Sequence, residues 1–115
     1  MILQDYDGPL SYGQLIEVLN GLVGETVCVK VPGAGSALTA WYEHVGQLAR
    51  LDSHQGAEYM VGPHASLVLW PGEVEEVYLR AVEGGQFFTV TLRIGGAGIL
   101  IGDVAQHASD RVPFE

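Results

Sequence analysis

Four histidines are the side chains most suited to hold a metal ion, and they are widely spaced: His44, His54, His64 and His107. No two of them have the i, i+2 spacing of a strand or the i, i+4 spacing of a helix that places two imidazoles on one face. A site formed by Asp52 and the first three histidines requires a sharp bend and the loop after it to fold together. We therefore expect hydrogen-bonded histidines and no metal site.

The residue types of general acid and base catalysis are present, but without partners. Glu73, Glu75 and Glu76 follow a Pro-Gly turn, and nothing in the sequence supplies a pocket that would separate their pKa values. The glycine-rich segments 33–36 and 95–98 are not followed by the helix that a phosphate-binding loop requires. No serine stands in a G-x-S-x-G motif. We predict no catalytic residue, no cofactor and no enzymatic activity.

The charge of the chain restricts its partners. Its 115 residues contain 5 Lys and Arg against 14 Asp and Glu, a net charge of −9. Such an excess repels phosphate backbones, so DNA binding is not expected and RNA binding is disfavoured. If nucleic acid binds, we expect a single strand held by aromatic or polar groups in a small pocket. A protein partner with a basic surface would be attracted.

Several features are typical of a cytoplasmic protein. No apolar run reaches the roughly 18 residues that cross a bilayer, and the first residues lack the basic start and apolar stretch of a secretion signal. The single cysteine, Cys28, excludes an intramolecular disulfide and lies within an alternating pattern, where a buried thiol is expected. We predict a cytoplasmic protein that does not bind membranes.

One short helix is expected near the start of the chain, at about residues 11–22, after an arm of residues 1–9. Ser11 and Gln14 have the spacing of a capping box, and Leu10 and Leu15 have that of a hydrophobic staple. Apolar residues then recur with helical spacing, and glycines follow at the end of this pattern.

The rest of the chain alternates with period 2, which is typical of half-buried strands. In the long stretch 38–52 the alternation of Trp41, Glu43 and Val45 gives way to Leu48, which predicts a bulge or sharp bend at Gly46. A Gly-Gly pair on each side of the clearest strand predicts a meander. The expected strands are 26–31, 38–52, 67–70, 74–82, 87–94 and 99–101, with a further short strand suggested at 58–61.

These elements predict a single domain over residues 1–115 that is mainly β. Six short strands behind one N-terminal helix favour a small, strongly bent antiparallel barrel of the Sm-like or SH3-like kind, over about residues 25–104. An open two-layer α+β sheet is the alternative. The tail 105–115 has no clear period and is expected to be loose.

The first half of the chain resembles the Sm-like barrels, the group that includes bacterial RNA chaperone rings. A short apolar helix ends near Gly24, an alternating strand follows, and residues 46–52 match a Gly-x-Leu-x-x-apolar-Asp signature. The resemblance implies a ring-shaped oligomer and a ligand surface at Asp52, His54 and Gln55. The sequence departs from the family in having no Asn shortly after Asp52, and it has Asp103 near the turn where the family pairs Arg with Gly.

Five residues are candidates for contact with another copy of the chain. Phe87 and Thr89 lie on the polar side of their strand, where an outward Phe indicates a contact surface. Residues 99–101, Ile99, Leu100 and Ile101, are uncharged and would form a strand edge open to pairing. We expect strand-edge pairing around 87–93 and 99–103 to build a homo-oligomer.

The sequence therefore leaves three functions open. The first is an oligomeric, non-enzymatic binding or scaffolding module of the Sm-like kind. The second is an acidic protein-binding module, of the inhibitor or immunity type, that covers a basic partner. The third is a barrel that binds a small ligand or a metal through His44, His54 and His64.

Overall fold

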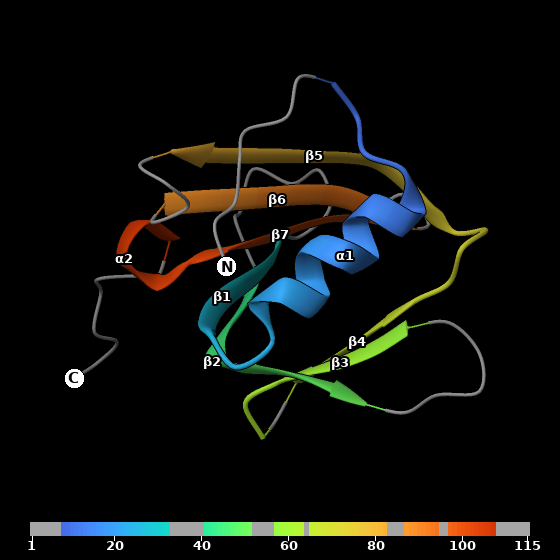
Figure 1. Cartoon of the computed structure of the whole chain (residues 1–115). Helices are drawn as coiled ribbons and strands as arrows, with labels where there is room; N and C mark the ends of the chain where they lie inside the picture. The colour runs from blue at the N-terminus through green and yellow to red at the C-terminus, as the bar shows by residue number, and fades with distance from the viewer. Residues whose placement is uncertain are drawn as a thin grey trace.

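The computed structural model describes residues 8–32, 41–51, 57–63, 65–82, 87–94 and 97–107, and it confirms a mainly β protein with one N-terminal helix. The strands form one antiparallel sheet in the order β4-β3-β2-β1-β7-β6-β5 (Figure 1). There are seven strands because the short one suggested at 58–61 is present. The elements are α1 (Tyr12–Leu22), β1 (Thr26–Pro32), β2 (Trp41–Leu51), β3 (Ala57–Val61), β4 (Ala65–Leu69), β5 (Val74–Val82), β6 (Phe87–Ile94), β7 (Ala97–Asp103) and α2 (Val104–His107).

Helix α1 begins with the predicted capping box. The backbone N–H of Gln14 donates to Ser11 Oγ at 3.1 Å, and the backbone N–H of Ser11 donates to Gln14 Oε1 at 2.8 Å. Leu10 and Leu15 on either side of this box are buried, as a hydrophobic staple requires. The helix ends before Gly24, whose φ of +98° lies in the left-handed region that favours glycine. Local sequence therefore determines both ends of α1.

The sheet is curled but open, because its end strands β4 and β5 do not pair with each other within the described residues. Helix α1 lies on the inner side of the curl (Figure 1), where its apolar residues join the strand residues in one core cluster. The backbone N–H of Leu10 donates to the Val77 carbonyl on β5 at 2.7 Å, and the Tyr12 hydroxyl donates to the Leu69 carbonyl at the end of β4 at 2.8 Å. The start of α1 thus bonds to both end strands.

Strand β2 carries the bend at Gly46, but the alternation does not slip there. Its pairing with β1 is continuous up to Gln47, and its pairing with β3 begins at Leu48. His44 and Gly46 lie opposite Val29 and Val27 on the inner face, and Leu48 is buried there too. Val45 therefore points outward and is 48% exposed. Of the two predicted possibilities, a bulge or a sharp bend, the strand has the bend, because a glycine without a side chain lets it turn with its alternation intact.

Two further local features differ from expectation. Strand β5 has a bulge between Glu75 and Tyr78, where Glu76 has φ of +52°. Residues 104–107 form the short helix α2, which contacts β1 and β7, so the first part of the tail is ordered. No helix in the described part of the chain is long and apolar enough to cross a membrane.

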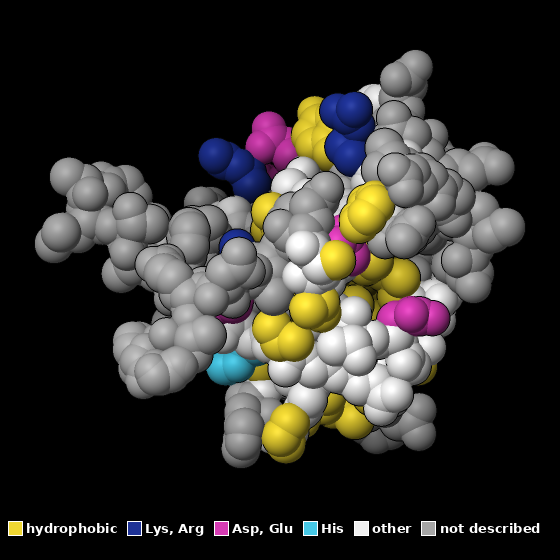
Figure 2. All heavy atoms as spheres, turned by 90° about the vertical axis from the view of Figure 1, so that its left-hand side faces the viewer, with side chains coloured by type: hydrophobic (Ala, Val, Ile, Leu, Met, Phe, Trp, Pro, Cys, Tyr) yellow, Lys and Arg dark blue, Asp and Glu magenta, His cyan; other side chains and the backbone are white. Residues whose placement is uncertain are grey.

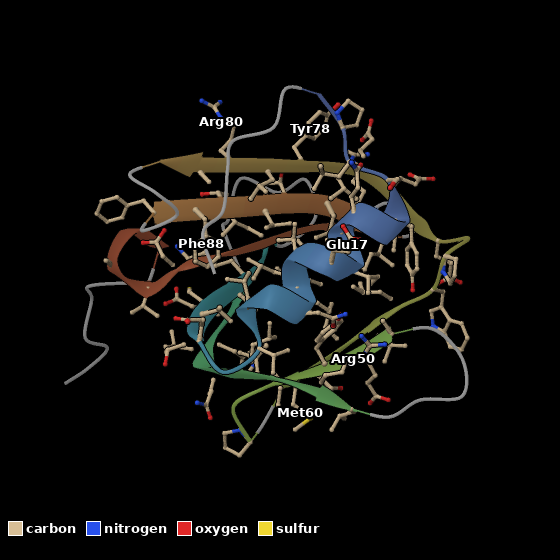
Figure 3. The ribbon with its side chains drawn as sticks, viewed as in Figure 1. Glu17, Arg50, Met60, Tyr78, Arg80 and Phe88 are labelled. Atoms are coloured by element: carbon tan, nitrogen blue, oxygen red, sulfur yellow. The ribbon has the colours of Figure 1, made fainter. Side chains whose placement is uncertain are left out.

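A polar cluster joins the end of α1 to the bent half of the sheet. Arg50 Nη1 donates to Asn20 Oδ1 at 2.7 Å and to the Tyr59 hydroxyl at 3.3 Å, and the Tyr59 hydroxyl donates to Asn20 Oδ1 at 2.9 Å. Figure 3 shows Arg50 between α1 and the β3–β4 hairpin. Burial raises the pKa of Tyr59, and the charge of Arg50 opposes this shift in part. The neutral phenol is therefore favoured in the folded protein.

The raised pKa of Tyr59 predicts a loss of stability in alkali. In the unfolded chain this phenol ionises at about pH 10, and in the folded protein it ionises at a higher pH. The contribution of the neutral phenol to the free energy of unfolding is therefore complete below about pH 10 and is lost as the pH rises further. The free energy of unfolding, measured with urea at pH of about 9 and of about 11, should fall less between these two pH values in Tyr59→Phe than in the original protein. Tyr78→Phe, which removes an exposed hydroxyl outside this cluster, is the control. If the free energy of unfolding of Tyr59→Phe falls as much between the two pH values as that of the original protein, Tyr59 is not the source of the pH dependence.

The bend in β2 predicts that Gly46 tolerates no side chain. A Cβ at this position would lie 2.6 Å from both the Cα and the N of Gly62, and backbone atoms cannot move aside as a flexible side chain can. Gly46→Ala should lower the free energy of unfolding by about 2 kcal/mol or more, measured by urea denaturation. Gly72→Ala, at a turn where a Cβ meets nothing within 4 Å, should change it little. Equal stability of the two variants would contradict this reading of the bend.

Candidate functional site

The residues predicted to bind a ligand or a metal are mostly not placed by the structure. Asp52, His54 and Gln55 lie outside the described residues, and so does His64. His44 is on the inner face of β2, where it lines a cavity considered below. The described residues contain no group of three or more His, Cys, Asp or Glu side chains that could hold a metal. The ligand surface implied by the resemblance therefore stays a prediction.

The expectation that β6 and β7 offer open edges is wrong. Strand β6 pairs with β5 and β7, and β7 pairs with β6 and β1. Ile101 is fully buried and Ile99 packs against the core, so neither side chain is suited to contact another copy. The reason is long-range: β1, far away in the sequence, covers the side of β7 that a simple meander would leave free.

The other three predicted contact residues, Phe87, Thr89 and Leu100, lie on the outer face of β5, β6 and β7, the side away from α1. Residues directly opposite each other on neighbouring strands point to the same side. Leu100 lies opposite Thr91, which lies opposite Tyr78. Figure 3 shows Tyr78 pointing away from α1. We use the term outer face for the surface formed by Tyr78, Arg80, Phe87, Thr89, Thr91, Arg93 and Leu100.

A hollow of about 320 Å³ lies in the outer face. Tyr78, Thr91 and Leu100 line it, and Gly98 adds to its depth because the place of a Cβ is open space. At its rim Arg93 Nε lies 3.1 Å from Glu76 Oε1, in an ion pair whose two side chains are more than half exposed. Such an exposed pair contributes little to stability. The hollow thus combines an exposed aromatic ring and an aliphatic side chain with one flexible ion pair.

Basic side chains gather on this part of the molecule. Of the 5 Lys and Arg in the chain, Arg80 and Arg93 lie on the outer face, and Lys30 lies beside it opposite Leu100. Figure 2 shows Lys and Arg side chains at the top of the molecule, the side on which Figure 1 shows β5, next to exposed hydrophobic atoms. The outer face is therefore less acidic than the chain as a whole.

Tyr78 is the residue of this face that the sequence prediction missed. Tyr78 is a large aromatic residue within a strand, and it is 44% exposed. Its neighbours Val77 and Leu79 are buried. Residues next to each other in a strand point to opposite sides, so two apolar residues on either side of Tyr78 indicate that its own side chain points outward.

Asp103, the residue at which the sequence departs from the Sm-like pattern, has a structural role. Its carboxylate is buried, and its Oδ1 accepts a hydrogen bond of 2.8 Å from the backbone N–H of Phe88. This bond joins the end of β7 to the start of β6, so the carboxylate faces the protein interior rather than a ligand.

Cys28 is fully buried, as expected for an inert thiol. It lies opposite Gly102 on β7 and Val45 on β2. Burial raises the pKa of the thiol, and the negative charge of Glu43 raises it further. The thiolate, which is the reactive form, is therefore disfavoured twice over.

Comparison with known proteins adds no relative: the chain matches no family model, no curated protein and no solved structure.

The environment of Cys28 predicts very slow modification in the folded protein. A thiol-disulfide reagent at pH of about 8 should label Cys28 at least about 100-fold more slowly in native buffer than in urea, because the thiol is both covered and protonated. The release of the coloured leaving group measures the rate. Rapid stoichiometric labelling of the native protein would show that Cys28 is accessible and would contradict this assignment.

Proposed function

We propose that this chain is a non-enzymatic binding or scaffolding module of the Sm-like kind that assembles into homo-oligomers through its outer face. The observation that supports this most is the placement of Phe87, Thr89 and Leu100 on the same face of the sheet as the exposed ring of Tyr78. Tyrosine is enriched at protein interfaces because it combines a large apolar ring with a hydroxyl that hydrogen-bonds. The hollow gives such a contact a shape to fit.

Electrostatics also favours this face for self-association. Each copy carries a net charge of −9, so two copies repel each other in most orientations. The outer face holds Arg80 and Arg93, with Lys30 close by, and Arg93 forms an ion pair with Glu76. Contact through it brings together a part of each copy where cations offset the nearby acidic side chains.

The Sm-like assignment is supported by the arrangement of the first half of the chain. A short helix ends just before Gly24, a strand follows, and a strongly bent second strand turns at Gly46. Helix α1 occupies the inner side of the curl and bonds to both end strands, so helix and sheet enclose one core in the manner of a small barrel. We extend this to a ring-shaped oligomer as part of the proposal.

Substitution at Leu100 tests the proposal. Leu100→Asp places a charge beside the hollow, on the outer surface of the sheet, and should reduce a native oligomer to a monomer with the fold intact. Val23→Asp is the matched control, because Val23 is an exposed apolar residue just after α1 and away from the outer face. Size-exclusion chromatography with light scattering at two salt concentrations gives the mass, and circular dichroism reports the fold.

The outcomes separate the parts of the proposal. A ring of about five to seven copies that Leu100→Asp dissociates supports both the outer face and the Sm-like kinship. A dimer that Leu100→Asp dissociates supports the outer face and contradicts the ring. A monomeric original protein contradicts self-association and favours an acidic module that binds a basic protein, whose binding should weaken steeply with salt.

A further inference from the structure

The two end strands of the open sheet differ in how they protect their edges. Natural proteins block edge pairing with charges, proline or a bulge. Strand β5 has a bulge, the exposed charges Glu75, Glu76 and Arg80, and a bond from Leu10 to Val77 that covers part of its edge. Another strand would therefore pair poorly with β5.

Among the described residues, strand β4 has only the bond from the Tyr12 hydroxyl at its last residue, Leu69, and none of the other protections. Its sequence, ASLVL, contains no charge and no proline, and it pairs with β3 over all five residues without a bulge. Within the described part of the chain, β3 is its only neighbour in the sheet. Ser66 is exposed, and Leu67 and Val68 are half-buried. An uncharged edge of this kind is a template for a further strand.

The pairing of β3 shows which backbone groups of β4 face outward. The N–H of Gly62 donates to the Gln47 carbonyl, so the Val61 carbonyl, which lies on the opposite side of the same peptide unit, points away from β2 and toward β4. In an antiparallel strand the residues bonded to one side alternate with those bonded to the other. Ala65, opposite Val61, therefore faces β3, and Ser66 and Val68 direct their N–H and C=O groups away from it. An added strand would meet these groups.

A cavity of about 320 Å³ opens beside the same edge. Its walls come from four strands, with Val29, Val31, His44, Val61 and Leu67 among the lining residues. Val29 and Val61 are almost fully buried, so the inner part of the cavity is apolar. Its volume is enough for one large apolar side chain, and it lies at the lower end of the range for ligand pockets.

We propose that β4 binds an extended peptide segment of another protein by strand addition, with one apolar side chain of the peptide inserted in this cavity. Main-chain hydrogen bonds to Ser66 and Val68 supply affinity, and the cavity supplies specificity. Residues that alternate with the inserted one point to the outside. These residues are basic, because the chain carries a net charge of −9 and Glu58 lies opposite Val68 on the outward side of the hairpin.

A second copy of the chain is a poorer occupant. The inward residues of its own β4, Leu67 and Leu69, already pack in its own core, so it has no free side chain for the cavity. A pair of five-residue strands spans only about 17 Å, and their edges alone bury much less than the roughly 1,000 Å² of a lasting interface. A flexible peptide supplies both the edge and the side chain.

The site is separate from the outer face, so its test is separate too. The probes are four capped nine-residue peptides in which lysine alternates with Leu, Val, Phe or Trp, titrated into the full chain by calorimetry at physiological salt. Each has a partner peptide N-methylated at alternate residues, which keeps the charge and removes the hydrogen bonds. We expect at least one peptide to bind, and its N-methylated form to bind at least tenfold more weakly.

Variants of the chain locate the binding. Ser66→Pro removes an outward N–H that β3 does not use, and Ala65→Leu narrows the cavity and keeps the backbone. Both should weaken binding at least tenfold, and Tyr78→Ala on the outer face should leave it unchanged. Failure of all four peptides, equal binding of the N-methylated forms, or full binding by Ala65→Leu would each overturn the proposal. An oligomer that Leu100→Asp dissociates would stand in any of these cases.

Discussion

The close approach of two glycines determines the shape of this protein. At Gly46 the strand β2 leaves β1 and turns to pair with β3, and the backbone of Gly62 lies where a side chain on Gly46 would be. The N–H of Gly62 donates to the Gln47 carbonyl at 3.0 Å, which ties the β3–β4 hairpin to the bend. Without this turn the hairpin would continue the plane of β1 and β2, and no concave side would exist for α1 to fill.

The curl and the helix depend on each other. An antiparallel sheet with one apolar face needs a cover for that face, and α1 provides it with Leu15, Leu19 and their neighbours. The helix in turn needs the gap between β4 and β5, because both end strands bond to its first residues. Because α1 lies on the inner side of the sheet, it does not cover the outer face of β5, β6 and β7. Within the described residues it bonds to β4 only at Leu69, the last residue of the strand, and leaves the rest of the β4 edge open. Both proposed binding surfaces therefore follow from the position of the helix.

The local sequence pattern was sufficient to predict the helix and the strands, but not which strands lie next to each other in the sheet. The capping residues of α1 and the alternation of 87–94 act over a few residues, and the structure has these elements where the sequence predicts them. The place of β7 between β1 and β6 depends on a contact between residues far apart in the chain, which period 2 does not encode. For the same reason Ile101 was assigned to an edge although it lies in the core. The sequence located the bend at Gly46 but not its geometry. The strand turns there with its alternation intact, which leaves the apolar Val45 on the outside. An exposed valine of this kind interrupts the hydrophobic pattern of the sequence although the strand itself is regular.

Charge would give the two proposed surfaces different roles. A chain with a net charge of −9 gains encounter rate with basic partners and loses it with copies of itself. Two of the five cations, Arg80 and Arg93, lie on β5 and β6, where self-contact would bring copies together. The two strands of the hairpin that carries the β4 edge contain Glu58 and no Lys or Arg. Self-association through the first surface would therefore leave the second free in every copy, and several equal sites on one assembly bind a repetitive partner more tightly than one site does. A scaffold built in this way needs no catalytic group, because its effect comes from the number and spacing of its sites.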